Sequence, residues 1–248
     1  MLASVRAVGA QPAPDRSGQR WGFGAFLLVE AVFVCSAVFV AALAKTSGAT
    51  TGKSLPFFMV GLIAPTVLAA TVAVVITTVR GNGPSIDLRL RWNWHDVKVG
   101  LQLGLVGLVL TYLAAVIWVK AVGQGNATSA IGALVDNASL PVAAAVVLFL
   151  YVCFLGPLCE EIIYRGLLWG AIERQGWSRW AAFVLTTLIF AASHLEPLRT
   201  SLLIVIGLPI GMARLITRRL TASVVAHVVN NFLPGLTMLL VSLGVMPS

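Results

Sequence analysis

Two acids and an arginine stand close together in a stretch of sequence that is otherwise apolar. The segment 156–166 contains Glu160, Glu161 and Arg165, and the residues before it, 140–155, are mainly Ala, Val, Leu and Phe. A charge at the centre of a membrane helix costs roughly 2.5–3.5 kcal/mol on insertion scales, so such residues usually face a polar interior and mark function. We therefore expect the chemistry of this protein to be in this segment.

The spacing of these three residues predicts different roles for the two acids. On a helix, residues four apart share a face, whereas immediate neighbours point about 100° apart. Glu161 is therefore expected to pair with Arg165 as a supporting residue, while Glu160 stays free to act on a substrate or on water. The plain alternative is a buried structural ion pair with a spare acid beside it.

Two histidines and an asparagine follow on later apolar segments. His194 lies four residues after Phe190, and His227 lies four residues before Asn231. Depth can be counted from the cytoplasmic end of each predicted span at about 1.5 Å of rise per residue. Glu160 and Asn231 would then lie about 15 Å deep, His227 about 9 Å and His194 about 20 Å. The four groups can then share one cavity. They suit hydrolysis, in which a carboxylate or imidazole takes a proton from water and donors stabilise the tetrahedral oxyanion.

These residues, taken in order, resemble the three motifs of the CPBP intramembrane proteases. That family includes the type II CAAX prenyl endopeptidases and bacteriocin-processing and self-immunity proteins. The resemblance covers residues 141–233, includes Gly166 and a glycine-rich sixth span, and rests on Glu160-Glu161-x-x-x-Arg165, Phe190-x-x-x-His194 and His227-x-x-x-Asn231.

The resemblance implies an endopeptidase that cleaves membrane-associated proteins, CAAX-type prenylated proteins among them, from a cavity open to the cytoplasm. Carried over, Glu160 and His194 would activate water, while His227 and Asn231 would stabilise the oxyanion. If zinc took part, Glu160, His194 and His227 would be its ligands, with an open fourth position. An HExxH motif is absent and asparagine is a poor zinc ligand, so we favour the mechanism without a metal and expect no cofactor.

The composition predicts an integral membrane protein. The chain has 248 residues, of which 58% are hydrophobic and 10% charged, against about 25% charged in soluble domains. Its basic excess, 17 Lys and Arg against 9 acids, falls in short loops and not in one stripe, so no nucleic-acid partner is expected. The expected partners are the lipid bilayer and a membrane-associated protein or peptide substrate.

The apolar runs predict an all-α, polytopic transmembrane bundle of about seven spans, with six to eight compatible with the sequence. We expect a mobile tail over 1–20, N-terminal transmembrane helices over 21–139, a protease core over 140–243 and a short tail over 244–248. The expected spans are 22–44, 57–79, 99–119, 140–170, 180–194, 200–213 and 221–243. The fifth and sixth are short, so they can be broken or partly shielded by protein.

Thirteen of the 17 bases lie in four segments: the N-terminal tail, residues 80–98, the end of the fourth span with the connection after it, and the connection before the last span. In a bundle of seven spans these four segments fall on the same side of the membrane. The positive-inside tendency then places the N-terminus in the cytoplasm and the C-terminus outside.

A proton-coupled transporter is the main alternative function, because intramembrane Glu and His also build proton relays, although no inverted repeat is visible in the sequence. A non-catalytic immunity or scaffold protein of the same fold is another. Glu30, in the first span, is expected to make a polar contact with a neighbouring helix.

Overall fold

The structure, a computed structural model, describes residues 18–48, 54–123 and 140–246, and within these ranges it consists of helices and connections without strands. The all-helical prediction is confirmed. Six helices are long and apolar enough to cross a membrane: α2 (Phe23–Thr46), α3 (Leu55–Val79), α5 (Trp94–Val122), the continuous helix Val142–Arg174, α11 (Thr200–Thr217) and α12 (Leu220–Ser242).

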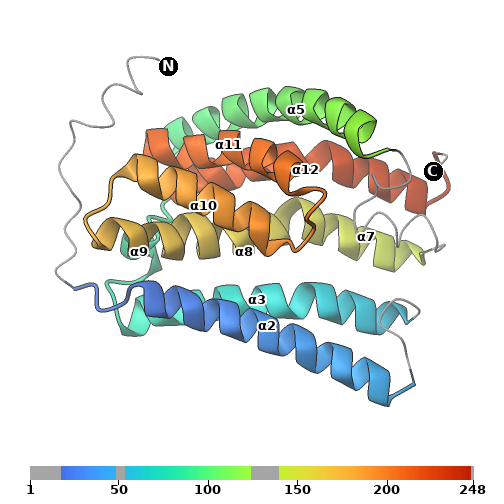
Figure 1. The fold of residues 1–248 in the computed structure, drawn as a ribbon, viewed down its shortest axis with the longest axis horizontal. Helices are drawn as coiled ribbons and strands as arrows, with labels where there is room; N and C mark the ends of the chain where they lie inside the picture. Colours follow the sequence, from blue (N-terminus) through green and yellow to red (C-terminus); the bar gives the residue numbers. More distant parts are fainter. Residues whose placement is uncertain (1–17, 49–53, 124–139, 247–248) are drawn as a thin grey trace.

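The fifth predicted span corresponds to α10 (Arg179–Ser193), which has 15 residues and is shorter than the six helices above. With α11 it forms a hairpin that turns back before the far end of the bundle (Figure 1). Within the described ranges, α2 begins and α12 ends at opposite ends of the bundle (Figure 1). The predicted segments are therefore present, and six of them are full-length spans.

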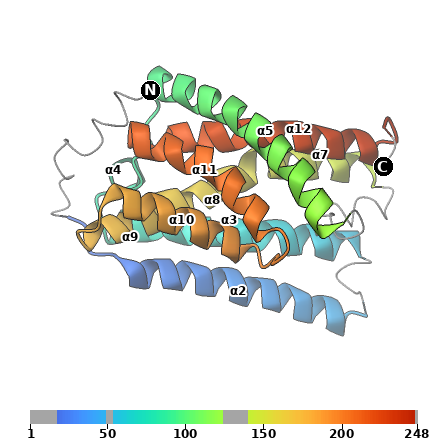
Figure 2. The same ribbon diagram turned by 45° about the horizontal axis from the view of Figure 1, so that its top comes forward.

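The helices are arranged in layers (Figures 1 and 2). The pair α2 and α3 lies on one side and α5 on the other, with the continuous helix, α10, α11 and α12 between them. The main core cluster joins α2 and α3 to the continuous helix, and its largest wholly buried side chain is Trp169. The helix that carries the two acids is thus held from both sides.

Glycines let α5 pack closely on α12. A Cβ at Gly100 would lie 2.6 Å from the carbonyl oxygen of Ala222, and one at Gly104 would lie 2.6 Å from Val229 Cβ. Small residues four apart permit such close approach of membrane helices. Gly100 and Gly104 are therefore the residues of α5 at which the two helix backbones come closest.

The fourth span is not the uniform α-helix that the sequence analysis assumed. Its segments are α7 (Val142–Leu150), the π-helical η2 (Tyr151–Leu155), α8 (Gly156–Glu161), the π-helical η3 (Ile162–Leu168) and α9 (Trp169–Arg174). Pro157 has no N–H to donate to the carbonyl of Cys153 and its ring crowds that carbonyl, so a wider turn precedes it. Both acids therefore lie in α8, a short α-helical segment between two π-helical segments. Such π-helical turns are frequent at functional sites.

The predicted tail ends earlier than residue 20. Residues 1–17 lie outside the described residues. Gln19 is buried, and the backbone N–H of Arg20 donates to the carbonyl of Arg80. Trp21 Nε1 donates to Asp87, the last residue of the short helix α4 (Pro84–Asp87) in the connection to α5. Residues 18–20 are thus packed against the bundle, because the buried Trp21 anchors them.

Candidate active site

The centre of the site is a buried ion pair within the fourth span. Arg165 Nη1 donates to Glu161 Oε1 at 2.9 Å, and both side chains are fully buried. The guanidinium group also stacks over the Phe190 ring, 4.5 Å from its centroid, and its Nη2 lies 3.5 Å from the carbonyl oxygen of Gly207. A Cβ at Gly207 would lie 3.4 Å from Arg165 Nη2, so the glycine in α11 allows this close approach. The sequence-predicted pairing is present.

His227 connects this pair to the second acid. Its Nδ1 lies 3.0 Å from Glu161 Oε1, and its Nε2 lies 3.7 Å from Glu160 Oε2. A carboxylate only accepts, so the Nδ1 proton is the donor in the first contact. Glu161 therefore fixes the orientation of the imidazole and directs Nε2 toward Glu160.

The two acids differ sharply in exposure. The side chain of Glu161 is 0% exposed, whereas that of Glu160 is 26% exposed. A buried carboxylate with two charged or polar partners acts as a fixed counter-charge, while a partly open one can meet water or substrate. The pairing of Glu161 and the accessibility of Glu160 agree with the geometry that the spacing predicts.

His194 lies at the end of α10 and approaches the site through Phe190. Its Nδ1 donates to the carbonyl oxygen of Phe190 at 2.8 Å, which leaves Nε2 with a free lone pair in the neutral ring. The Phe190 ring packs against both imidazoles, with centroids 4.8 Å from His194 and 5.7 Å from His227. Among the described residues no ion pair joins His194 to Glu160, so the Phe190 ring connects His194 to His227 and not to the second proposed water-activating group.

The two neighbouring asparagines of α12 point to different helices. Asn231 Nδ2 donates to the carbonyl oxygen of Val152 in η2 at 3.1 Å, while the buried Asn230 accepts from Thr111 of α5 at 3.0 Å. Asn231 is therefore on the side of the acid-bearing helix, as its spacing from His227 predicts. One of its two amide protons is used by Val152, and the other is available to a substrate.

Sequence reasoning missed a chain of polar side chains that joins α2, the acid-bearing helix and the end of α10. Tyr164 donates to Ser193 Oγ at 2.8 Å, and Ser193 donates to the carbonyl oxygen of Phe190 at 2.8 Å. Glu30 of α2 is a hydrogen-bond partner of Tyr164, so its predicted contact with a neighbouring helix is confirmed. The chain ends beside His194. The only signal for it in the sequence is a set of polar residues in apolar helices.

The donor groups do not gather as a metal site. In the part of the chain that the structure describes, no three His, Cys, Asp or Glu side chains are arranged to hold an ion. Glu160 and His227 lie near one another, but the remaining nitrogen of His227 is directed at Glu161. The set Glu160, His194 and His227 does not fit zinc as it stands, and we derive no step through a metal.

A bundle of apolar helices with a buried cluster of two acids, an arginine and a histidine defines a multi-pass membrane protein with an intramembrane site. Residues 142–233 match a family model, the type II CAAX prenyl endopeptidase Rce1-like family. The resemblance to the CPBP proteases is thereby confirmed over this segment. Neither the curated proteins nor the solved structures gave a match. The matched family is one of CAAX-type intramembrane proteases, which suggests a peptidase that acts on a protein substrate.

Proposed function

We propose that the protein hydrolyses a peptide bond of a membrane-associated protein, using Glu160 as the general base. One observation carries this proposal: a partly exposed carboxylate lies 3.7 Å from Nε2 of an imidazole whose other nitrogen is held by a buried Glu161–Arg165 pair. A base needs access to water, and its neighbours need fixed orientations. Glu160 has both.

The reaction follows from these positions. Glu160, assisted by Nε2 of His194, takes a proton from water, and the hydroxide attacks the carbonyl carbon of the substrate. The oxyanion accepts hydrogen bonds from Nε2–H of His227 and from the second amide proton of Asn231. The protonated Glu160 then gives its proton to the leaving nitrogen as the C–N bond breaks. A doubly protonated His227 would balance the charge of the two acids together with Arg165.

The site would open toward the cytoplasm. Arginines gather at the end of the bundle where α9 and α11 end and α10 and α12 begin, and short connections rich in bases favour the cytoplasmic side. His227 lies seven residues after Leu220, or about 10 Å from that end along α12. A CAAX-type prenylated protein, which presents its lipidated C-terminus at the cytoplasmic surface, is the substrate class we propose.

Cleavage of a membrane-bound substrate tests this function. Purified protein in liposomes should cleave a prenylated reporter peptide, and Glu160→Gln should lower the rate by roughly 10²–10⁴ because the base is lost while size is kept. The matched control is His95→Ala, which removes a histidine whose side chain is 72% exposed. Proton flux into liposomes without cleavage would support a transporter, and neither activity would support a scaffold or immunity protein.

The substrate can be sought in cells at the same time. Membrane peptides of cells carrying the wild type are compared by proteomics with those of cells carrying Glu160→Gln or His95→Ala. A protein that stays uncleaved with Glu160→Gln alone identifies the substrate. If no peptide differs between the wild type and Glu160→Gln, while the reporter is cut, the assay substrate is not the physiological one.

Chelators test the role of the metal. We propose that activity persists in 1,10-phenanthroline, because no ion would hold the attacking water. If the chelator abolishes cleavage and added Zn²⁺ restores it, the glutamate mechanism is wrong. Glu160, His194 and His227 would then be assigned as ligands of a metal that activates water.

A further inference from the structure

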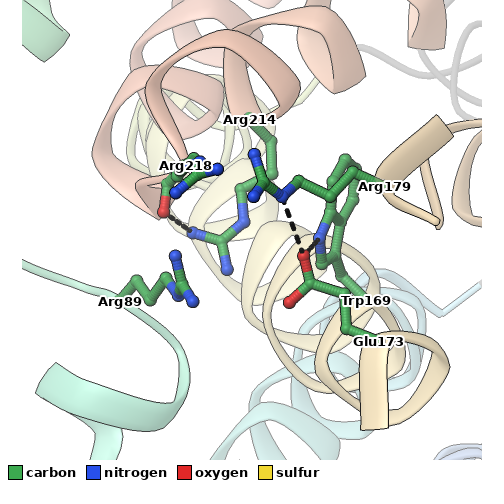
Figure 3. Close-up of a pocket in the computed structure, with 6 residues that line it drawn as sticks. All are labelled: Arg89, Trp169, Glu173, Arg179, Arg214 and Arg218. Carbon is green, nitrogen blue, oxygen red and sulfur yellow. Dashed lines mark hydrogen bonds and ion pairs between the residues drawn. The ribbon is translucent and has the colours of Figure 1, made fainter. Parts of the chain in front are cut away.

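Four arginines from separate parts of the chain converge at one end of the bundle. Arg89 comes from the connection before α5, Arg179 is the first residue of α10, Arg214 is in the last turn of α11 and Arg218 follows it. Together with Trp169 and Glu173 of α9 they line one pocket, shown in Figure 3. None of these residues has a part in the proposed hydrolysis.

The charge of the pocket is strongly positive. Among its described lining residues Glu173 is the single acid against four guanidinium groups. That acid is shared: it accepts from Trp169 Nε1 at 2.9 Å and lies 3.9 Å from Arg179 Nε. Arg89 is near enough to Arg179 for the two charges to repel one another. Positive charges this close together repel one another, so a bound anion would stabilise the arrangement.

The arginines are held in this arrangement by the backbone. Arg214 Nη1 donates to the carbonyl oxygen of Arg218 at 2.9 Å, and its guanidinium group lies 5.8 Å from the centre of the Trp169 ring. Arg89 and Arg218 have φ values of 58° and 62°. Residues other than Gly and Asn rarely adopt this region, and Arg218 does so as the C-cap of α11. The backbone thus fixes the directions from which two of the arginines approach the pocket.

A buried donor also needs an acceptor. Arg218 Nη2 is buried and has no hydrogen-bond partner among the described residues. A buried donor without a partner is rare and destabilising. Phosphate oxygens match guanidinium donors in geometry and charge, and arginine is the usual residue for binding them.

We propose that this pocket binds the phosphate group of an anionic lipid at the membrane surface. The connection 88–93, the start of α5, the α9–α10 turn and the start of α10 each bring one tryptophan to the same end of the bundle, and all four are exposed: Trp92, Trp94, Trp177 and Trp180. Exposed tryptophans are enriched at the level of lipid headgroups. Figure 3 shows the arginine side chains arranged around the pocket, and binding of the phosphate would move Arg89 or Arg179, which are both partly exposed.

The test uses the full-length protein in uncharged detergent, with its unfolding temperature as the readout. It is titrated separately with short-chain phosphatidylglycerol, short-chain phosphatidylcholine and inorganic phosphate. Phosphatidylglycerol should raise the unfolding temperature at concentrations where phosphatidylcholine has no effect. The rise should shrink at high salt, because the interaction is electrostatic.

Matched variants assign the effect to the pocket. Arg218→Asn removes the charge, suits the left-handed backbone and keeps the carbonyl that Arg214 uses. It should weaken phosphatidylglycerol binding by about tenfold or more, as loss of a charge-assisted hydrogen bond does. Arg89→Asn, on another element, should do the same if Arg218→Asn fails to fold. Arg91→Asn is the control, since Arg91 is exposed and does not line the pocket.

Each outcome decides the matter. Equal binding by wild type and both pocket variants, or an equal loss with Arg91→Asn, would overturn the proposal in favour of diffuse surface charge. Absence of any response to phosphatidylglycerol and phosphate would also overturn it. A response to inorganic phosphate alone would keep the phosphate site and reject lipid as its source. None of these readouts depends on peptidase activity, so the proposed function and this site fail separately.

Discussion

At the residue scale, we expect Arg165 to support the site by holding Glu161 and to perform no chemistry itself. Both side chains are 0% exposed, and removing one member of a buried pair typically costs about 3–5 kcal/mol. Arg165→Ala should therefore lower the unfolding temperature together with activity, because Glu161 would be left as an uncompensated charge. Thermal unfolding in detergent measures the first effect and reporter cleavage the second. A variant of full stability that has lost activity would instead assign the arginine a direct role.

Asn231 and Asn230 should separate catalysis from packing. Asn231→Ala removes a proposed oxyanion donor on the side of the acid-bearing helix, so the turnover rate should fall by about 10²–10³ with little change in unfolding temperature. Asn230→Ala removes the partner of Thr111 between α5 and α12. It should lower the unfolding temperature and leave the turnover of the folded fraction near that of the wild type. The reverse pattern would show that the two faces of α12 have been assigned wrongly.

Contacts along one helix followed from spacing, whereas contacts between helices did not. The pair Glu161 and Arg165, and the common side of His227 and Asn231, could be predicted because residues four apart share a face. The contact of Glu161 with His227 depends on how α12 is rotated against α8, and no spacing in the sequence encodes that rotation. His194 likewise reaches the site through the Phe190 ring, not through a contact that its depth predicts.

At the scale of elements, the closeness of α5 to α12 positions both His227 and Asn230. Gly104→Ala should destabilise the protein by about 1–3 kcal/mol, because the new Cβ would lie 2.6 Å from Val229 Cβ and force the helices apart. The matched control is Gly24→Ala in α2, whose Cβ would have no atom within 4 Å. Unfolding temperatures of the two variants should move apart, with only Gly104→Ala lowered. Equal unfolding temperatures would mean that α5 and α12 can move apart enough to accept the extra methyl group without loss of stability.

The elements also show where sequence periodicity fails. The apolar runs located every membrane-length helix, because the cost of exposing backbone in lipid leaves few alternatives to a helix. They did not reveal the π-helical turns on either side of the acids, since a π-turn has no hydrophobic period of its own. Pro157 is the one residue that signals such a break. The α10–α11 hairpin was expected to be short. Its hydrogen bond to α5, from Trp118 Nε1 to the carbonyl of Leu198 at 2.6 Å, had no signal in the sequence.

At the scale of the whole molecule, the number of spans and the distribution of bases together determine how the protein lies in the membrane. α2 begins at the end of the bundle that carries the arginine pocket, and α12 ends at the opposite end (Figure 1). We expect the arginine-rich end in the cytoplasm and the end of α12 outside, because bases are retained on the cytoplasmic side. This orientation would place the proposed phosphate site against the anionic inner leaflet and would open the proposed peptidase site toward substrates anchored there.

Single cysteines test this orientation. The native Cys35, Cys153 and Cys159 are first replaced by alanine, and a cysteine is then introduced at Arg91 or at Val245, both of which are exposed. A membrane-impermeant maleimide should label Val245→Cys in intact cells and Arg91→Cys only after lysis. Labelling of both before lysis would show leaky cells, so a cytoplasmic marker protein serves as the control. Labelling of Val245→Cys only after lysis would mean that both ends of the chain lie on one side and that the number of crossings is even, as it is when α10 does not cross the bilayer and the six membrane-length helices do.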